Sequence, residues 1–534
     1  MTRIAKSLVT ASVIALGAAA PAFAKTFIYC SEASPEGFDP APYTAGSTFD
    51  ASAHPVYNRL LEFTKGTTQV EPGLAESWEV SDDGLEVTFH LRKGVKWQSN
   101  DAFTPTREFN ADDVIFSYER QASADHPWHL YLPGITYEYF SAMEMSSLIS
   151  TIEKIDDHTV KFVLSRPEAP FLANIAMPFA SIVSAEYAET LAAAGHMEDL
   201  NNAPIGTGPF SFVAYQKDAV IRYKKNADYW GPAPAIDDLV FAITPDASVR
   251  LQKLKAGECH LMPYPSPADL EDIRADASLK LDSQPGLNVA YLAYNTTVAP
   301  FDNPKVRKAL NMAMNKQAII DAVFQGAGQV AKNPIPPTMW SYNDAITDDP
   351  YDPDAAKAIL DAEGAAGLSM KIWAMPVQRP YMPNARRTAE LMQADFAKIG
   401  VTVEIVSYEW GEYLKKSTEP DRDGAVILGW TGDNGDPDNF MGVLLSCAAT
   451  GDGGSNRAQW CNEAFSDLLS QAKLTSDPAE RTRLYEEAQV IFKDQAPWAT
   501  IAHSTQYVPM AANVTGFVMS PLGDYTFDNV DLAE

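Results

Sequence analysis

Two charged residues lie in loops whose composition would hold them rigidly. Arg379 is in the loop 375–380, and Asp433 is in the loop 430–439. The proline, glycine and asparagine of these loops fix tight turns instead of flexible tips. A guanidinium binds carboxylates, and a carboxylate binds cations. The two loops could therefore present an anion-binding group and a cation-binding group together.

The same residues also have a purely structural interpretation. An aspartate in a loop of this kind commonly accepts a hydrogen bond from its own backbone. That interpretation applies equally to Asp433, Asp436 and Asp438. Arg379 could equally pair with a carboxylate on the surface. Residue type and loop composition alone leave both interpretations open.

The elements expected around the two loops would bring them to one edge of a sheet. Apolar patterns predict strands over 368–374, 401–405 and 425–430, and helices over 383–399 and 409–416. Strands and helices that alternate in this order indicate a parallel sheet covered by helices. Arg379 and Asp433 each follow a predicted strand, at the carboxyl edge where such sheets bind ligands.

Elsewhere the chain mixes short strands and helices without repeats. Alternating apolar residues predict half-buried strands over 85–91 and 160–164. Asn303 and Pro304 supply the cap and first turn of a helix whose apolar residues lie on one face. These patterns indicate an α/β protein.

The N-terminus has the pattern of a secretory signal peptide. Arg3 and Lys6 precede an apolar run over 8–20, and the residues 22–24 form an A-x-A cleavage pattern, with cleavage after Ala24. The run is shorter than the roughly 20 residues that a membrane-spanning helix needs. We therefore expect residues 1–24 to be removed on export and the mature protein to lie in the periplasm.

Charge and cysteine content agree with an exported protein that does not bind nucleic acid. The formal net charge is −29, which disfavours nucleic acid and anionic membranes. An oxidising compartment favours disulfides among the four cysteines. Cys447 and Cys461 are close in sequence across a glycine-rich stretch and are expected to pair, which leaves Cys30 to pair with Cys259.

Patterns typical of enzymes and of metal sites are missing from the sequence. It has no H-E-x-x-H motif, no G-x-S-x-G nucleophile elbow and no P-loop. Its eight histidines are scattered, and the closest pair, His126 and His129, is separated by Pro127. We therefore expect a protein without catalytic residues, cofactor or metal.

Several short segments resemble, in their order along the chain, the peptide-binding branch of the bacterial extracellular solute-binding proteins, which supply ABC importers. Besides the loops of Arg379 and Asp433, the segments are 28–32, 71–78, 91–97, 110–114 and 204–210. Each alone is a weak signal, but their order from Lys25 to the C-terminus is specific.

This resemblance implies two lobes that close on a ligand about a hinge, with an extra domain in the first lobe. The first lobe would comprise residues 25–56, 207–284 and 503–534, the extra domain 57–206, and the second lobe 285–502. The chain crossings near 284 and 503 would then form the hinge. Cys30 and Cys259 both fall in the first lobe.

The resemblance also implies roles for individual residues. Asp433 is similar to the residue that binds the ammonium of a dipeptide, and Arg379 to the residue that binds its carboxylate. The other implied ligand-binding residues are the backbone of Gly429 and Thr431, the loop of Gly46, Ser47 and Thr48, and the pocket side chains Trp430 and Tyr381. Ser47 replaces an expected threonine, and the loop 418–424 is altered in length.

The resulting expectation is a monomeric protein that captures dipeptides and delivers them to an inner-membrane ABC permease. Whether a chemoreceptor also docks stays open. Within the same class, the alternative ligands are haem, longer peptides and glutathione. From other classes, a secreted peptidase would need an activated nucleophile or a metal, and a periplasmic holdase would need a large cleft.

Overall fold

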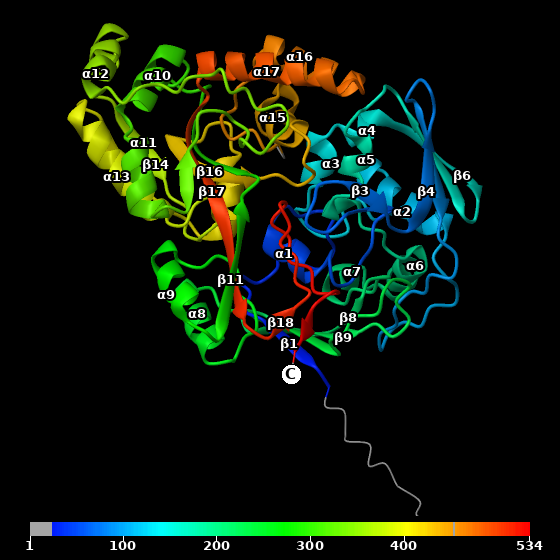
Figure 1. Cartoon of the computed structure of the whole chain (residues 1–534). Helices are drawn as coiled ribbons and strands as arrows, with labels where there is room; N and C mark the ends of the chain where they lie inside the picture. Colours follow the sequence, from blue (N-terminus) through cyan, green and yellow to red (C-terminus); the bar gives the residue numbers. More distant parts are fainter. Residues whose placement is uncertain (1–23, 452–453, 534) are drawn as a thin grey trace, which may run out of the picture.

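The computed structural model describes residues 24–451 and 454–533. Except for Ala24, the predicted signal peptide, residues 1–24, lies outside the described residues. Within them, three larger sheets and their helices make up most of the chain (Figure 1).

The first sheet contains the N-terminal strand. Its four strands, in spatial order, are β1 (Thr26–Tyr29), β10 (Asp238–Ala242), β9 (Val220–Lys225) and β8 (Phe210–Gln216). β1 is parallel to β10, and the other neighbours are antiparallel. Elements around this sheet are α1 (Gly46–Ala51), α8 (Ala247–Lys255), α9 (Leu270–Ala275), β18 (Val514–Thr515) and β19 (Asp531–Leu532). Phe27, Tyr223 and Phe241 belong to the apolar core of this sheet, which draws residues from both ends of the chain.

The second sheet is antiparallel throughout. Its strands, in spatial order, are β4 (Ala75–Val80), β5 (Glu86–Leu91), β7 (Thr159–Leu164) and β6 (Ile149–Asp156). The elements near it are α2 (Ala111–Ala122), α3 (Glu138–Ala142), α4 (Met145–Leu148), α5 (Phe171–Asn174), α6 (Ala185–Ala194), α7 (Asp199–Asn202), β2 (Leu61–Phe63) and β3 (Val70–Pro72). The strands predicted over 85–91 and 160–164 are confirmed as β5 and β7.

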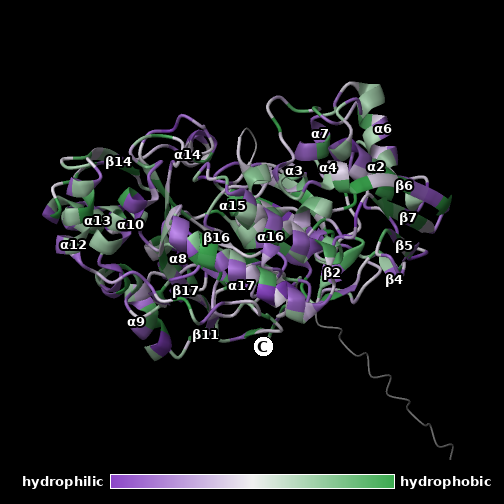
Figure 2. Ribbon diagram, turned by 90° about the horizontal axis from the view of Figure 1, so that it is seen from above, coloured by the Kyte–Doolittle hydropathy of each residue, from purple (hydrophilic) through white to green (hydrophobic). Residues whose placement is uncertain are grey.

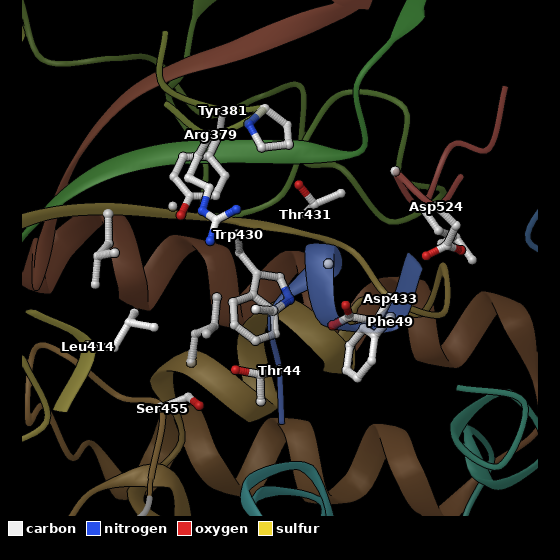
Figure 3. A pocket seen from close by; sticks show the side chains of 18 of the residues that line it. Thr44, Phe49, Arg379, Tyr381, Leu414, Trp430, Thr431, Asp433, Ser455 and Asp524 are labelled. Atoms are coloured by element: carbon white, nitrogen blue, oxygen red, sulfur yellow. The ribbon is translucent and has the colours of Figure 1, made fainter. Parts of the chain in front are cut away.

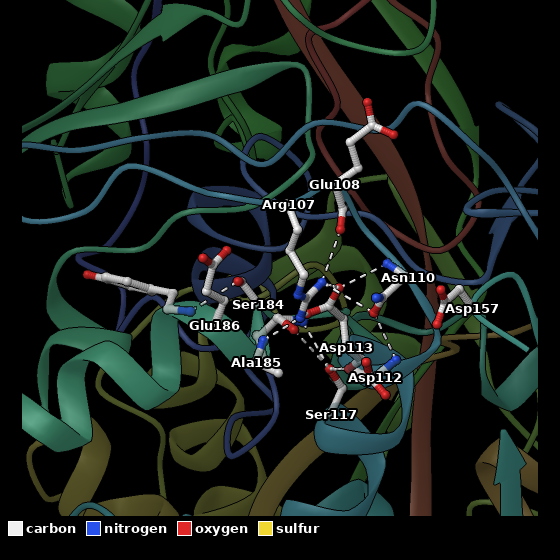
Figure 4. A network of polar contacts seen from close by, with 12 residues as sticks. Arg107, Glu108, Asn110, Asp112, Asp113, Ser117, Asp157, Ser184, Ala185 and Glu186 are labelled. Atoms are coloured by element: carbon white, nitrogen blue, oxygen red, sulfur yellow. Dashed lines mark hydrogen bonds and ion pairs between the residues drawn. The ribbon is translucent and has the colours of Figure 1, made fainter.

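The start of α2 is fixed by a network of charged and polar groups (Figure 4). The Asn110 side chain accepts a hydrogen bond from the Asp112 N–H, and the Asp113 carboxylate accepts one from the Asn110 N–H. This reciprocal pair satisfies helix N–H groups that would otherwise lack partners. Asp113 also accepts two 2.7 Å hydrogen bonds from Arg107 and one from the Ala185 N–H. A single buried carboxylate thus joins α2 to the start of α6.

The third sheet is the largest. In spatial order its strands are β11 (Leu279–Pro285), β17 (Trp498–Ala511), β12 (Asn288–Tyr294), β16 (Ala425–Thr431), β14 (Ser369–Trp373) and β15 (Thr402–Val406), with β13 (Gly328–Val330) on β17. The accompanying helices are α10 (Pro304–Ala313), α11 (Lys316–Ile319), α12 (Pro353–Ala362), α13 (Ala385–Lys398), α14 (Trp410–Ser417), α15 (Asp438–Leu445), α16 (Glu463–Leu474) and α17 (Pro478–Gln495). Figure 2 shows hydrophilic and hydrophobic residues side by side along α16 and α17.

The predicted run of alternating strands and helices is confirmed as β14, α13, β15, α14 and β16. These three strands are parallel, as expected for strands joined by helices. The sheet as a whole is mixed, however, because β12 runs antiparallel to both β16 and β17. The parallel arrangement predicted for the run 368–430 is therefore confirmed, and the antiparallel strands come from segments that the run does not contain. The helix predicted at Asn303 is confirmed as α10, capped by the Asn303 side chain.

The long strand β17 links the third sheet to the first. Its first half pairs with β12 and β13, and its second half pairs with β11 (Figure 1). Isolated bridges from Leu261 to Met510 of β17 and to Tyr29 of β1 then connect the two sheets. The hinge predicted near 284 and 503 lies where these pairings change, and the three-domain division stays a prediction. A single apolar cluster includes core residues of both the second and the third sheet.

Both predicted disulfides are confirmed as Cys30–Cys259 and Cys447–Cys461. Over residues 24–451 and 454–533, no helix has the length and apolar character needed to cross a membrane.

Candidate ligand-binding site

One pocket collects residues from segments that are far apart along the chain. Seven of the nine predicted ligand residues line it: Gly46, Arg379, Tyr381, Gly429, Trp430, Thr431 and Asp433. Figure 3 shows Arg379 and Tyr381 toward one side of this pocket, with Asp433 and Asp524 toward the other. Its empty volume, including open solvent, is about 930 Å³.

The floor of the pocket is the last part of β16. One edge of this strand is paired with β12 along its whole length, from Ala425 to Thr431. The other edge is paired with β14 only at Ala425 and Val426. Among the described residues, the stretch 427–431 therefore has an edge that no strand occupies. Such an edge can accept an extended peptide as an additional strand.

The need for glycine at position 429 is explained by the Tyr381 ring, which packs against it. A Cβ at this position would overlap both the Tyr381 ring and the backbone oxygen of Val289. Only glycine leaves room for the two contacts. Tyr381 is itself buried, with its hydroxyl 3.9 Å from the Met375 sulfur. Because Gly429 has no side chain, the Tyr381 ring can pack there and form one wall of the pocket.

Arg379 is held by its backbone, while its charged head faces the pocket. Its N–H and C=O bond reciprocally with Met382, and Ser504 donates a 2.7 Å hydrogen bond to the Pro380 carbonyl. The guanidinium stacks 4.7 Å from the Trp410 ring centre and lies 3.8 Å from a Glu32 oxygen. It donates no hydrogen bond to any residue that the structure describes. Its planar fork is thus placed and oriented but still able to donate to a carboxylate.

Asp433 is placed by a neighbour six residues along the chain. The Asn439 side-chain oxygen accepts hydrogen bonds from the Asp433 N–H at 2.8 Å and from the Trp430 indole at 3.0 Å. This double contact closes the loop between β16 and α15. The Oδ2 atom of Asp433 is shielded from solvent and has no hydrogen-bond partner among the described residues. A buried oxygen of this kind is costly unless a donor reaches it.

The pKa of Asp433 shows how strongly burial disfavours the charged form of this carboxylate. Burial raises it to about 7, from an ordinary value of 3.8. The negative charge of Asp524 raises it further, while the side chains of Asn439, Tyr139 and Trp430 lower it. Loss of hydration therefore dominates. A cation bound at this carboxylate would compensate for that loss.

Four charged residues line the pocket, and they differ in how they are paired. Arg379 faces Glu32, Arg457 lies 3.5 Å from Glu138, and Asp524 lies 3.2 Å from the His54 ring. Among the described residues, Asp433 alone of the four has no oppositely charged group within 4 Å. The pocket therefore offers its strongest attraction for a cation at Asp433.

The loop of Gly46, Ser47 and Thr48 meets the expectation only in part. Gly46 lines the pocket, but Ser47 and Thr48 are not among the lining residues. Both are buried in α1. The Thr48 hydroxyl accepts a hydrogen bond from the Glu36 N–H at 3.0 Å, and its own N–H donates to Ala45. The predicted role of this loop therefore rests on Gly46.

The two other aspartates of the Asp433 loop are structural in this arrangement. Asp436 accepts a hydrogen bond from the Asp438 N–H and pairs with Arg481 at 2.8 Å. Neither residue lines the pocket. The turn-forming interpretation thus describes Asp436, whereas Asp433 points its carboxylate into the pocket (Figure 3).

Several lining residues were missed by sequence reasoning: Thr44, Tyr139, Tyr264, Trp410, Arg457 and Asp524. Trp410 begins a predicted helix, and an aromatic residue at the start of a helix near a strand end could have suggested it. Asp524 follows Gly523 in a C-terminal loop, and nothing local connects that loop to β16. Only the tertiary fold brings these positions together.

Comparisons with known proteins agree with this arrangement. A family model described as Bacterial extracellular solute-binding proteins, family 5 Middle, matches residues 69–452. The Dipeptide-binding protein of Escherichia coli (strain K12) is 57% identical over 522 residues, which are 98% of this chain and 97% of that protein. Heme-binding protein A of Haemophilus influenzae is 50% identical over 508 residues, which cover 95% of this chain and 92% of that protein.

A solved structure is similar over nearly the whole chain. The dipeptide binding protein from Pseudoalteromonas sp. SM9913, in complex with Met-Leu, has a TM-score of 0.91 and 41% sequence identity, and covers 95% of this chain and 100% of its own. The expected α/β fold of a two-lobed periplasmic binding protein is therefore confirmed. The match of the family model and the near-complete coverage of the relatives together place the chain: it belongs to family 5 of the bacterial extracellular solute-binding proteins.

Proposed function

We propose that this chain captures dipeptides and delivers them to an ABC importer, without changing them chemically. The observation that carries the proposal is the half-buried Asp433 carboxylate opposite the Arg379 guanidinium. Within residues 24–451 and 454–533, one oxygen of Asp433 has no hydrogen-bond partner and the guanidinium donates no hydrogen bond. A dipeptide would place its ammonium on Asp433 and its carboxylate on Arg379. Its backbone would bond the open edge of β16 at Gly429 and Thr431, with Gly46 on the opposite wall.

The two charges would act together as a length gauge. An extended chain advances at most about 3.3–3.6 Å per residue. A third residue would move the carboxylate by that distance, beyond the reach of an arginine held by Met382 and Ser504. Selectivity would then rest on the two termini and the backbone, while side chains lie in the remaining space of the pocket.

The proposal includes the two-lobed division. The first lobe would be residues 25–56, 207–284 and 503–534, the extra domain 57–206, and the second lobe 285–502. Closure about the crossings near 284 and 503 would bring Gly46 toward β16. Export by the signal peptide would place the protein in the periplasm, with an inner-membrane ABC permease as its partner.

A second candidate is the same kind of protein with a different ligand. It is favoured by the similarity to a relative named for haem binding. Haem has carboxylates but no ammonium, so it would use Arg379 and leave Asp433 without a partner. Glutathione and longer peptides have an ammonium, but a different distance between the charges.

Calorimetry with a small set of ligands would test the proposal. We expect Ala-Phe to bind well, whereas N-acetyl-Ala-Phe, Ala-Phe amide and Ala-Phe-Ala bind much more weakly. Mass spectrometry of ligand co-purified from a native preparation would identify the natural occupant. Haem or glutathione as the main occupant, with no measurable affinity for Ala-Phe, would contradict the proposal and favour the second candidate.

A further inference from the structure

A second carboxylate lies at the Asp433 end of the pocket. Asp524 belongs to the loop between β18 and β19 and lines the pocket together with Leu522 and Gly523 (Figure 3). Its charge is close enough to Asp433 to raise the pKa of that residue. The ammonium end thus holds two acidic side chains, whereas one backbone ammonium brings a single positive charge.

Asp524 is fixed in place by its neighbours. One of its oxygens lies 3.2 Å from the His54 Nε2 atom, and the next residue, Tyr525, donates its N–H to Asp50 at 2.9 Å. The His54 side chain is 8% exposed, but that of Asp524 is 22% exposed. His54 therefore contacts the Asp524 carboxylate from the buried side, and part of that carboxylate stays accessible to a ligand.

The pKa values of Asp524 and of its acidic neighbour Asp50 shift in opposite directions. Burial raises the pKa of Asp524, but the basic side chains of His54 and Arg59 outweigh burial and leave that pKa below the ordinary value. Asp50, by contrast, is only 2% exposed, and burial raises its pKa well above the ordinary value. Of these two acids, Asp524 is thus the one that can attract a ligand cation.

A neighbouring cavity begins at the same residue. Asp524 is shared between the ligand pocket and a cavity with an empty volume of about 1500 Å³, open solvent included. The charged residues along this cavity, apart from His54, are four acids and two bases: Glu62, Glu71, Asp524, Asp528, Arg59 and Lys65. Glu62 and Asp528 pair with the two bases, so a long cationic side chain that passes Asp524 would enter a space with a small net negative charge.

We propose that Asp524 makes this protein prefer dipeptides whose first residue carries a cationic side chain, such as lysine or ornithine. The inference rests on the proposed function, because it takes the ligand ammonium to lie on Asp433. The first side chain leaves the same carbon that bears the ammonium, so it starts beside Asp524. His54 acts as a positioning residue for the carboxylate.

The test compares two dipeptides of the same shape. Lys-Ala and norleucyl-alanine differ at the first residue only by the terminal ammonium of the side chain. By calorimetry at low salt we expect the wild type to favour Lys-Ala by about fivefold, the gain of a partly exposed charge pair. In the variant Asp524→Asn this ratio should fall to about one. The matched control Asp531→Asn removes an exposed carboxylate that pairs with Lys25 and lines neither cavity, and it should keep the wild-type ratio.

The position of the charge provides a second control. Ala-Lys and alanyl-norleucine carry the same pair of side chains at the second residue, and their ratio should not change in Asp524→Asn. A wild-type ratio of one for the first pair, or a ratio that Asp524→Asn leaves unchanged, overturns the inference. The wild-type comparison needs no variant, so misfolding of Asp524→Asn cannot hide the result. Failure of the proposed function looks different, because then Ala-Ala and norleucyl-alanine would not bind either.

Discussion

Asp433 and Arg379 each lie in a rigid loop at the end of a strand, but their charged groups have different surroundings. Arg379 lies against Trp410 and Glu32, whereas Asp433 has a buried oxygen that no described residue contacts by a hydrogen bond. The sequence could predict both residues, because turn-forming neighbours and strand ends are visible locally. It could not separate Asp433 from Asp436, because that difference depends on Arg481, far away in the sequence.

The raised pKa of Asp433 predicts how affinity depends on pH. An ammonium binds the ionised carboxylate, so dipeptide binding must displace a proton below pH 7. Asp524 and Tyr139 also face this group, but the pKa of Asp524 is lowered and that of Tyr139 is raised well above 10, so neither titrates in this window. We expect the affinity for Ala-Phe to fall about tenfold per unit between pH 7 and pH 5, and again above about pH 8, where the ligand ammonium loses its proton.

Calorimetry in buffers of different ionisation enthalpy would detect the released proton directly. The variant Asp433→Asn provides the control, since its weak residual binding should not change between pH 5 and pH 7. An affinity of the wild type that is constant over this range would show that Asp433 is already ionised in the free protein.

Arg379→Lys tests the carboxylate end of the site. Lysine keeps the charge but loses the planar fork and the stacking on Trp410. We expect the affinity for Ala-Phe to fall by about tenfold or more, because a charged hydrogen bond contributes about 1.5–3 kcal/mol. Ala-Phe amide, which lacks the carboxylate, should lose much less. Equal losses for both ligands, measured by calorimetry, would remove Arg379 from the site.

At the scale of elements, the site depends on the edge of β16 that β14 leaves open after Val426. The order β14, α13, β15, α14 and β16 could be predicted, because each element has its own periodic pattern and stop signals. The short overlap of β14 with β16 could not, since register is set by partners across the sheet. The antiparallel strands β12 and β17 escaped prediction for the same reason.

Gly429→Ala tests how β16 and the Tyr381 loop fit together. A methyl group there would overlap the Tyr381 ring and the Val289 carbonyl oxygen. Overpacking of this kind costs about 1–3 kcal/mol of unfolding free energy, and the displaced ring should also weaken Ala-Phe binding. Urea denaturation and calorimetry would measure the two effects.

Gly411→Ala is the matched control for this substitution. Its Cβ would meet only the end of the Glu409 side chain, at 3.3 Å, within the helix α14. Alanine is a better helix former than glycine, so the stability should be kept or raised. If Gly429→Ala is as stable and binds as well as Gly411→Ala, the open edge of β16 does not need the glycine.

At the scale of the whole molecule, the pocket is assembled from segments that are far apart: Gly46, the loops of Arg379 and Asp433, and Asp524 near the C-terminus. The sequence alone could suggest this assembly only through its resemblance to a family. Trp410, Tyr139 and Asp524 carry no local signal, and their contribution depends on how the three sheets are joined. A ligand that contacts several of these segments stabilises the arrangement in which they lie close together.

This arrangement predicts a ligand-dependent change in overall shape. We expect saturating Ala-Phe to reduce the radius of gyration measured by small-angle X-ray scattering, because the ligand joins Gly46 to β16 across the pocket. N-acetyl-Ala-Phe at the same concentration should leave the radius unchanged, since it lacks the charge for Asp433. Identical scattering with and without bound Ala-Phe would contradict closure on the ligand.

The central claim is that Asp433 receives the ammonium of a dipeptide, and a four-way calorimetric comparison tests it most directly. The wild type and Asp433→Ala are each titrated with Ala-Phe and with N-acetyl-Ala-Phe, while circular dichroism confirms the fold and Asp531→Ala serves as the control. Removing one partner of a buried charge pair costs about 2–5 kcal/mol, so Ala-Phe should bind Asp433→Ala at least about 30-fold more weakly. The acetylated ligand should bind the wild type poorly and lose little more in the variant. Near-native affinity of Asp433→Ala for Ala-Phe, or equal affinity of the wild type for the free and acetylated ligands, would contradict the account.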